Sequence, residues 1–92
     1  MAHHVTDNEE RSRYELRLDG DVAGWIDYSR SDGVIAMTHA EVERERRNQG
    51  LGERMVRGAL DDVRERGLRV RPLCPFVAAY VRRHPETQDL TV

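Results

Sequence analysis

The sequence has no lysine: all fifteen of its basic residues are arginine, against seventeen acidic residues. The net charge of -2 disfavours a general nucleic-acid binder, which usually carries a basic face, but it leaves room for a local anion site. Cys74 is the only cysteine, so no intrachain disulfide can form, and we expect a reducing, cytoplasmic location. No apolar run approaches the roughly 20 residues of a membrane helix, so we expect no membrane association.

The 92 residues are enough for one hydrophobic core and too few for two. Residues 1–13 are polar and acidic and lack the apolar segment of a signal peptide. We therefore expect a flexible N-terminal tail over residues 1–13 and a single domain over residues 14–92.

Alternation of apolar and polar residues predicts strands over residues 14–18 and 22–29, joined by a turn at Asp19-Gly20. Residues 34–42 are rich in β-branched residues and nearly free of charge, which predicts a buried central strand. Three strands joined by tight turns form an antiparallel meander.

Apolar residues then recur at helical spacing from Leu51, which predicts a helix that ends at Gly67, a residue suited to cap it. A short strand over residues 69–73 follows. Pro75 opens a second helix, for which we expect an apolar face of Phe76, Val77, Tyr80 and Val81, and His84-Pro85 ends it. A strand–helix–strand crossover places its two strands parallel, so the predicted fold is α+β: a meander, a parallel β-α-β crossover and a C-terminal helix.

The segment RNQGLG, residues 47–52, joins the central strand to the first helix. Backbone N–H groups at a helix start favour anions, glycines at positions 50 and 52 remove the β-carbons that would block a phosphate, and Arg47 adds a cation. The plainer interpretation is that the glycines only ease a tight turn. A dinucleotide fingerprint would need a third glycine where Met55 stands, and a P-loop would need a lysine, so both are excluded.

The pattern [R/Q]-x-x-G-x-G resembles the pyrophosphate loop of the GNAT superfamily of acetyl-CoA-dependent N-acetyltransferases. The segments PLCPFV and Tyr-x-x-x-His-Pro extend the similarity to a small GNAT-like subfamily, over residues 14–90. The resemblance implies a reduced GNAT fold that binds acetyl-CoA, with backbone contacts to pantetheine near Val42. It assigns the pyrophosphate to Arg47, Asn48, Gln49, Gly50, Leu51 and Gly52.

One departure concerns the acceptor half of the fold. Full-size GNAT enzymes carry one or two helices between their first two strands, whereas this chain passes from Leu18 to Val22 through a tight turn. The resemblance therefore implies acetyl transfer to an amine that the sequence does not identify: a protein lysine, a protein N-terminus or a polyamine. The alternative is a CoA-binding or protein-interaction module without catalysis.

Two candidate catalytic residues belong to the C-terminal part. Tyr80 matches the tyrosine with which GNAT enzymes often protonate the leaving thiolate, although it equally fits the apolar face of its helix. Cys74 precedes a helix start, where the dipole favours a thiolate. It is a candidate nucleophile that carries a transient acetyl group, a candidate polar contact to the sulfur end of the cofactor, or else a small buried apolar residue.

Two more candidates lie on the central strand. His39 and Glu41 are two residues apart and so share a face. We expect that His39 faces Cys74 across the cleft as its base, or that either residue deprotonates the amine. Structural roles remain open for both. We expect no zinc site of the H-x-E…P-C-x-x-C kind, because Val77 stands where the second cysteine would be, and we expect no other metal.

Overall fold

The computed structural model describes residues 3–92, which form one mixed sheet and two helices. Short 3₁₀ helices, η1 at Arg44–Arg46 and η2 at Pro85–Leu90, follow β4 and α2. The main elements are β1 (His3–Asn8), β2 (Arg13–Leu18), β3 (Asp21–Ser31), β4 (Val34–Val42), α1 (Leu51–Glu65), β5 (Arg69–Pro72) and α2 (Pro75–Arg83).

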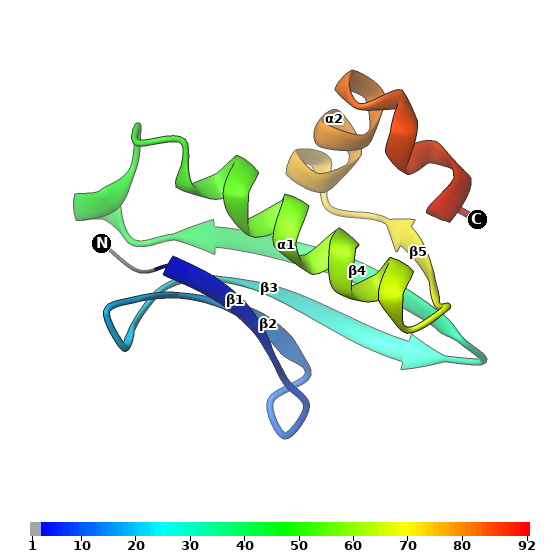
Figure 1. Cartoon of the computed structure of the whole chain (residues 1–92), viewed down its shortest axis with the longest axis horizontal. Helices are drawn as coiled ribbons and strands as arrows, with labels where there is room; N and C mark the ends of the chain where they lie inside the picture. Colours follow the sequence, from blue (N-terminus) through cyan, green and yellow to red (C-terminus); the bar gives the residue numbers. More distant parts are fainter. Residues whose placement is uncertain (1–2) are drawn as a thin grey trace.

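The five strands follow chain order across the sheet, β1-β2-β3-β4-β5. The first four are antiparallel neighbours, whereas β5 returns parallel to β4 after α1. Both helices lie on the same face of the sheet (Figure 1). This is the predicted α+β architecture, with the meander first and the parallel crossover after it.

Helix α1 forms the centre of the core because one of its sides is entirely apolar. Its buried residues are those of the predicted apolar stripe: Leu51, Met55, Val56, Ala59, Leu60 and Val63. They pack in one cluster with inward-facing sheet residues such as Ile35 and Met37 and with Val77, Tyr80 and Val81 of α2. Burial of such side chains contributes about 1.5–3 kcal/mol each.

The predicted flexible tail is wrong for the described part of residues 1–13. Strand β1 pairs with β2 over its whole length, from His3 opposite Leu18 to Asn8 opposite Arg13. Only Val5 is apolar in the segment, so the alternation that marks a strand is too weak to recognise. Val5 instead packs where α1 has a glycine: a β-carbon on Gly58 would lie 2.6 Å from Val5 Cγ2.

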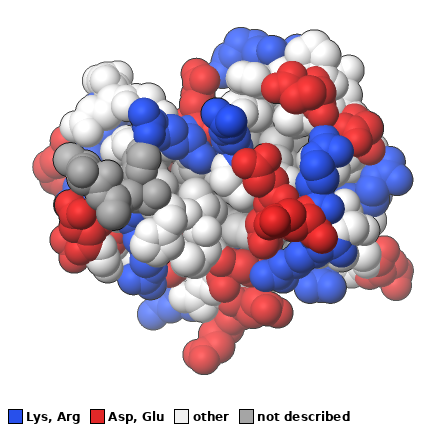
Figure 2. All heavy atoms as spheres, viewed as in Figure 1, with Lys and Arg blue, Asp and Glu red and all other residues white. Residues whose placement is uncertain are grey.

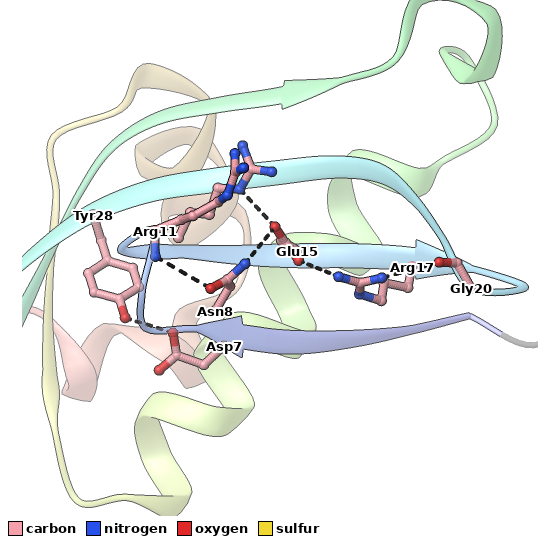
Figure 3. Close-up of polar contacts among 8 residues, drawn as sticks. Asp7, Asn8, Arg11, Glu15, Arg17, Gly20 and Tyr28 are labelled. Atoms are coloured by element: carbon pink, nitrogen blue, oxygen red, sulfur yellow. Dashed lines mark hydrogen bonds and ion pairs between the residues drawn. The ribbon is translucent and has the colours of Figure 1, made fainter.

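A set of buried and partly exposed polar side chains, called here the N-terminal network (Asp7, Tyr14, Tyr28, Asp62 and Arg66), ties β1 to the rest of the fold. The Tyr28 hydroxyl donates to Asp7 Oδ1 at 2.6 Å, as Figure 3 shows. Arg66 Nη1 lies 3.1 Å from the buried Asp7 Oδ2, an ion pair without a well-directed hydrogen bond. The Tyr14 hydroxyl donates to Asp62 Oδ2 at 2.8 Å, and Arg66 Nε reaches the same oxygen at 3.1 Å.

The sheet face opposite the helices holds one buried carboxylate. Glu15 is only 2% exposed, and Arg13 donates to it. Asn8 and Arg17 donate to it as well (Figure 3). Burial alone raises the pKa of the Glu15 carboxyl, but these three donors outweigh burial and hold that pKa below its usual value. The negative charge of Glu15 is therefore neutralised by its own neighbours, and this carboxylate is not available to a ligand.

Candidate functional site

The two parallel strands separate partway along β4. Strand β5 pairs with β4 only from Val34 to Met37, while β4 continues to Val42 beside β3 alone. The backbone N–H groups of Leu73 and Cys74 both donate to the Met37 carbonyl oxygen, at 3.0 and 2.9 Å, and this closes the pairing. Beyond it, the edge of β4 that faces α2 has no strand partner within residues 3–92.

The loop between β4 and α1 reaches the helix through two left-handed residues, Asn48 (φ 66°) and Gly50 (φ 73°). Gly50 is the residue before the helix, and no side chain caps the first N–H groups of α1. Such groups have no intrahelical partners and, with the helix dipole, favour an anion. Arg47 Nε donates to the Val42 carbonyl oxygen at 2.9 Å, which ties the loop to the end of β4.

These elements enclose a cleft of about 550 Å³, within the range of small-molecule sites. The end of β4 forms one wall, the loop and the first turn of α1 form another, and the start of α2 closes the side. The lining residues are Ala40, Glu41, Val42, Arg46, Arg47, Asn48, Gly50, Leu51, Gly52, Glu53, Met55 and Phe76.

The two loop glycines are required for different reasons. A β-carbon on Gly50 would meet nothing within 4 Å, so the positive φ of this residue is what favours glycine. A β-carbon on Gly52 would lie 2.8 Å from Cζ of Phe76, whose ring covers that turn of α1. Gly52 therefore allows α1 and the start of α2 to approach closely at the mouth of the cleft.

Six of the seven residues predicted to hold the cofactor line the cleft; Gln49 does not. Phe76 was expected on the buried face of its helix, but it is 40% exposed and belongs to the cleft wall. Arg46 was not predicted at all. The clue to Phe76 was available in the sequence, because Gly52 implies a bulky neighbour, but nothing in the sequence identified which one.

His39 and Glu41 lie on the face of the sheet opposite Cys74. Tyr28 pairs with Met37 and Asp27 with His39, so Thr38 is an extra residue that reverses the alternation of β4. Ala40 and Val42 then face the core, which includes Cys74, and their neighbours face outward. The predicted facing of His39 and Cys74 is therefore wrong. His39 Nε2 lies 3.0 Å from Glu41 Oε1 instead, with the imidazole 56% exposed.

Cys74 and Tyr80 both lie outside the cleft. Cys74 is 4% exposed within the apolar core. Tyr80 stacks on His84 with ring centroids 3.9 Å apart and lines a separate groove between α1 and α2. Burial raises the pKa of the Tyr80 hydroxyl, while the charge of Arg57 acts in the opposite direction. Of the four candidate catalytic residues, only Glu41 lines the cleft.

The surface carries no basic face on the side shown in Figure 2, where arginines and acidic residues are interspersed. No helix within residues 3–92 is long and apolar enough to cross a membrane. In the same part of the chain, no three His, Cys, Asp or Glu side chains are grouped so that they could hold a metal ion.

Comparison with known proteins bears on the fold and on the family. The structure is similar to the solution NMR structure of a GCN5-like protein from Staphylococcus aureus, with a TM-score of 0.70 and 20% identity over 97% of this chain and 87% of that one. No curated protein is similar enough to count as a match. Residues 13–90 match the family model described as GCN5-related N-acetyl-transferase. The chain therefore belongs to the family of GCN5-related N-acetyltransferases.

Proposed function

We propose that the protein binds acetyl-CoA in this cleft and transfers the acetyl group to a primary amine. The observation that carries the proposal is the junction of β4 and α1. A loop with two left-handed residues presents uncapped helix N–H groups to a cleft whose other wall is an unpaired strand edge. Phosphates fit the first feature, and an extended amide-bearing arm such as pantetheine fits the second.

The loop residues divide the binding task. Gly50, Leu51 and Gly52 supply backbone N–H groups for the pyrophosphate, and Asn48 turns the loop toward them. Arg47 keeps its Nη donors for a phosphate while its Nε holds the Val42 carbonyl. Because Arg47 occupies that carbonyl, pantetheine contacts would fall on other unpaired backbone groups of β4.

In the proposed reaction the amine nitrogen attacks the thioester carbonyl, the C–S bond breaks, and the CoA thiolate takes up a proton as the amine loses one. Glu41 is the candidate acceptor of the amine proton, because it is the one candidate catalytic residue that borders the cleft. Its carboxylate is paired with His39 on the outer face of the sheet, so it would serve an amine that approaches the end of β4 from that face. Direct attack is favoured over an acetyl-Cys74 intermediate, because the Cys74 thiol lies in the core.

The rival function is CoA binding without catalysis. Only the turn at Asp19 and Gly20 joins β2 to β3, so no helix walls an acceptor pocket there. Tyr80 and Cys74 also stand apart from the cleft. A domain that holds CoA and presents it to a partner protein would need only the cleft and the loop between β4 and α1.

Calorimetry with acetyl-CoA tests binding, and Gly50→Glu is the sharpest variant, because it places a carboxylate where the phosphates are proposed to lie. Gly33→Glu is its matched control. Gly33 has a similar φ (77°), equally open surroundings and the same added charge, but it lies in the turn before β4. We expect the melting temperature to rise with acetyl-CoA for wild type and Gly33→Glu only. Equal binding by Gly50→Glu would refute the assigned site.

Labelled acetyl-CoA offered with a panel of amines tests transfer. If direct attack holds, Cys74→Ala retains most of the rate, and wild-type protein mixed with acetyl-CoA alone shows no acetyl adduct by mass. An adduct on Cys74, with transfer lost in Cys74→Ala, would establish the covalent route. Tyr80→Phe completes the set: a large fall in rate would mean that the Tyr80 hydroxyl reaches the leaving thiolate after all. Binding without transfer to any amine would favour the rival function.

A further inference from the structure

The face of the sheet that the helices leave uncovered carries a group of side chains beside Glu41. Both helices of residues 3–92 lie on the other face (Figure 1). In the β3–β4 ladder Trp25 lies opposite Glu41, and Asp27 lies opposite His39. Opposed residues of paired strands point to the same face, so all four side chains share the open face. We call them the outer patch: Trp25, Asp27, His39 and Glu41.

Asp27 is the carboxylate of the outer patch that has no partner. Its side chain is partly exposed and makes no hydrogen bond or ion pair within residues 3–92. The Thr38 hydroxyl donates to its backbone carbonyl oxygen, at 3.3 Å, and not to its carboxylate. Arg13 stands opposite Asp27 on β2, but its Nε donates to Glu15. The Arg13 guanidinium also lies 5.2 Å from the centre of the Trp25 ring. The charge of Asp27 is therefore free to hold a cation from outside the chain.

The spacing of the two carboxylates in the outer patch suits a short diamine. Asp27 and Glu41 are diagonal neighbours on paired strands, which places their Cα atoms about 7–8 Å apart. Glu41 Oε1 is paired with His39 at 3.0 Å, and Oε2 has no partner within the described residues. Two nitrogens joined by three or four methylene groups span about 5–6 Å. The diagonal runs between Trp25 and His39, whose rings offer apolar contact to those methylene groups.

The charges around the outer patch favour a short cation over a long basic peptide. On β2, beside the patch, Arg13 and Arg17 flank Glu15 and leave a net positive charge. On the other side, beyond β4, Arg71 of β5 is exposed. A peptide rich in lysine or arginine would extend onto these arginines and be repelled. A diamine ends at the two carboxylates.

We propose that the outer patch binds the acceptor of the acetyl group, and that this acceptor is an aliphatic diamine or polyamine with three or four carbons between two of its nitrogens. The inference rests on the proposed function, since it names the acceptor class of the same transfer. Asp27 holds the nitrogen that stays protonated, and Glu41 takes one proton from the neighbouring ammonium. The nitrogen so freed bonds to the thioester carbonyl carbon, the C–S bond breaks, and the second proton of that nitrogen passes to the CoA thiolate.

The first test compares acetyl transfer from acetyl-CoA to 1,4-diaminobutane and to n-butylamine, which has the same carbon chain and one nitrogen. For wild type we expect kcat/KM to be about tenfold higher for the diamine, the size of one good charged contact. A second equivalent nitrogen alone would give only twofold. Asp27→Asn should remove the preference by raising KM for the diamine, with butylamine unchanged.

Asp32→Asn is the matched control for Asp27→Asn. Asp32 is exposed in the turn between β3 and β4, and its φ of 51° suits asparagine equally well. The variant removes the same charge from the same hairpin at a distance from the outer patch. We expect it to keep the wild-type preference for the diamine.

The second test measures binding without transfer. Trp25 is the only tryptophan of the chain, so its fluorescence reports on the outer patch directly. Titration with 1,4-diaminobutane should give a saturable change for wild type and Asp32→Asn. The apparent Kd should rise at least tenfold for Asp27→Asn.

The outcomes separate the diamine site from the proposed function. Equal kcat/KM for the two amines in wild type would overturn the diamine site and leave acetyl transfer standing. An equal loss for both amines in Asp27→Asn would mean that Asp27 supports the strand rather than the second nitrogen, which also overturns it. If acetyl-CoA binds but no amine is acetylated, the proposed transfer has failed. The Trp25 titration then decides alone whether the outer patch binds a diamine.

Discussion

The two ends of α1 lie in very different surroundings. At its C-terminal end, Asp62 and Arg66 join the N-terminal network, in which hydroxyls, carboxylates and a guanidinium from β1, β2, β3 and the end of α1 pair with one another. At its N-terminal end, no side chain caps the helix, and an exposed Phe76 ring covers Gly52. Polar groups at the C-terminal end of α1 are paired with one another, as in a structural part of the fold. The backbone N–H groups at the N-terminal end are uncapped and can bind a ligand, as in a binding site.

The largest expected effect on stability comes from removing Arg66, the cation of the N-terminal network. Arg66→Met leaves the buried Asp7 carboxylate without its ion pair and removes one partner of Asp62. Loss of one partner of a buried pair costs about 3–5 kcal/mol, and because the Arg66 side chain is 35% exposed we expect about 2–3 kcal/mol less free energy of unfolding. Urea unfolding measures it.

Arg82→Met is the control for that variant, since it removes the same charge from an exposed helix position, and we expect a change within about 0.5 kcal/mol. The affinity of folded Arg66→Met for CoA should equal that of wild type. A weaker CoA affinity in the folded fraction would show that the two ends of α1 are coupled. The C-terminal end would then not be purely structural.

The second effect appears at alkaline pH. Burial, followed by the hydrogen bond to the neighbouring carboxylate, raises the pKa of Tyr14 and of Tyr28 above the ordinary value of 10.0. The folded protein therefore keeps protons that the unfolded chain releases. Stability is fully present below pH 10 and falls as pH rises above it, by up to about 1.4 kcal/mol per pH unit for each tyrosine.

Tyr28→Phe isolates one of these tyrosines. The variant starts less stable because Asp7 loses a donor, but its stability should fall less steeply with pH. Urea unfolding between pH 9 and pH 11 compares the two slopes. Parallel curves for variant and wild type would mean that Tyr28 titrates normally in the folded protein.

A third, smaller effect concerns the docking of β1 on α1. Gly58→Ala gains about 1 kcal/mol of helix propensity but places a methyl group 2.6 Å from Val5 Cγ2. Overpacking costs about 1–3 kcal/mol, and valine is stiff, so we expect a net loss of about 1 kcal/mol. Adding Val5→Ala should restore part of that loss in a double-mutant cycle, whereas additive losses would show that the two residues do not contact.

The parts of the fold that were predicted from the sequence are those in which one spacing of apolar residues, helical or alternating, continues over many residues. The stripe of α1 and the strand over residues 34–42 are of this kind, and their bounds agree closely with the structure. Strand β1 was missed because its pairing depends on tertiary contacts: Val5 against Gly58, and Asp7 against Tyr28 and Arg66. No local pattern in residues 3–8 encodes those partners.

The site was predicted unevenly for a similar reason. The loop residues are contiguous, so a single motif, residues 47–52, was enough to predict which residues gather at the start of α1. Whether His39 faces Cys74 depends on one extra residue, Thr38, whose bulge turns His39 to the other face of the sheet. A bulge arises from the register of two paired strands, and the sequence of β4 alone does not show it.

The smallest expected effect on stability is that of changing His39 or Glu41, the outward pair on β4. Because the fold is little affected, variants of this pair can report on acetyl transfer. The side chains of His39 and Glu41 are 56% and 41% exposed and touch only each other among the interactions described, so His39→Ala or Glu41→Gln should change the free energy of unfolding by less than about 0.5 kcal/mol. A change of this size leaves the fold and the cleft intact. Any loss of acetyl transfer must then come from the proton that the amine has to lose.

Glu65→Gln, which removes the same charge from an exposed position at the end of α1, serves as the control. If Glu41 accepts the amine proton, Glu41→Gln slows transfer at least tenfold while CoA affinity stays constant, in keeping with the roughly 10²–10⁴-fold that general bases contribute. His39→Ala should slow it less, because His39 orients Glu41 rather than contacting the amine. A transfer rate equal to that of Glu65→Gln would mean that the amine enters already deprotonated, and the outward pair would then be an ordinary surface contact.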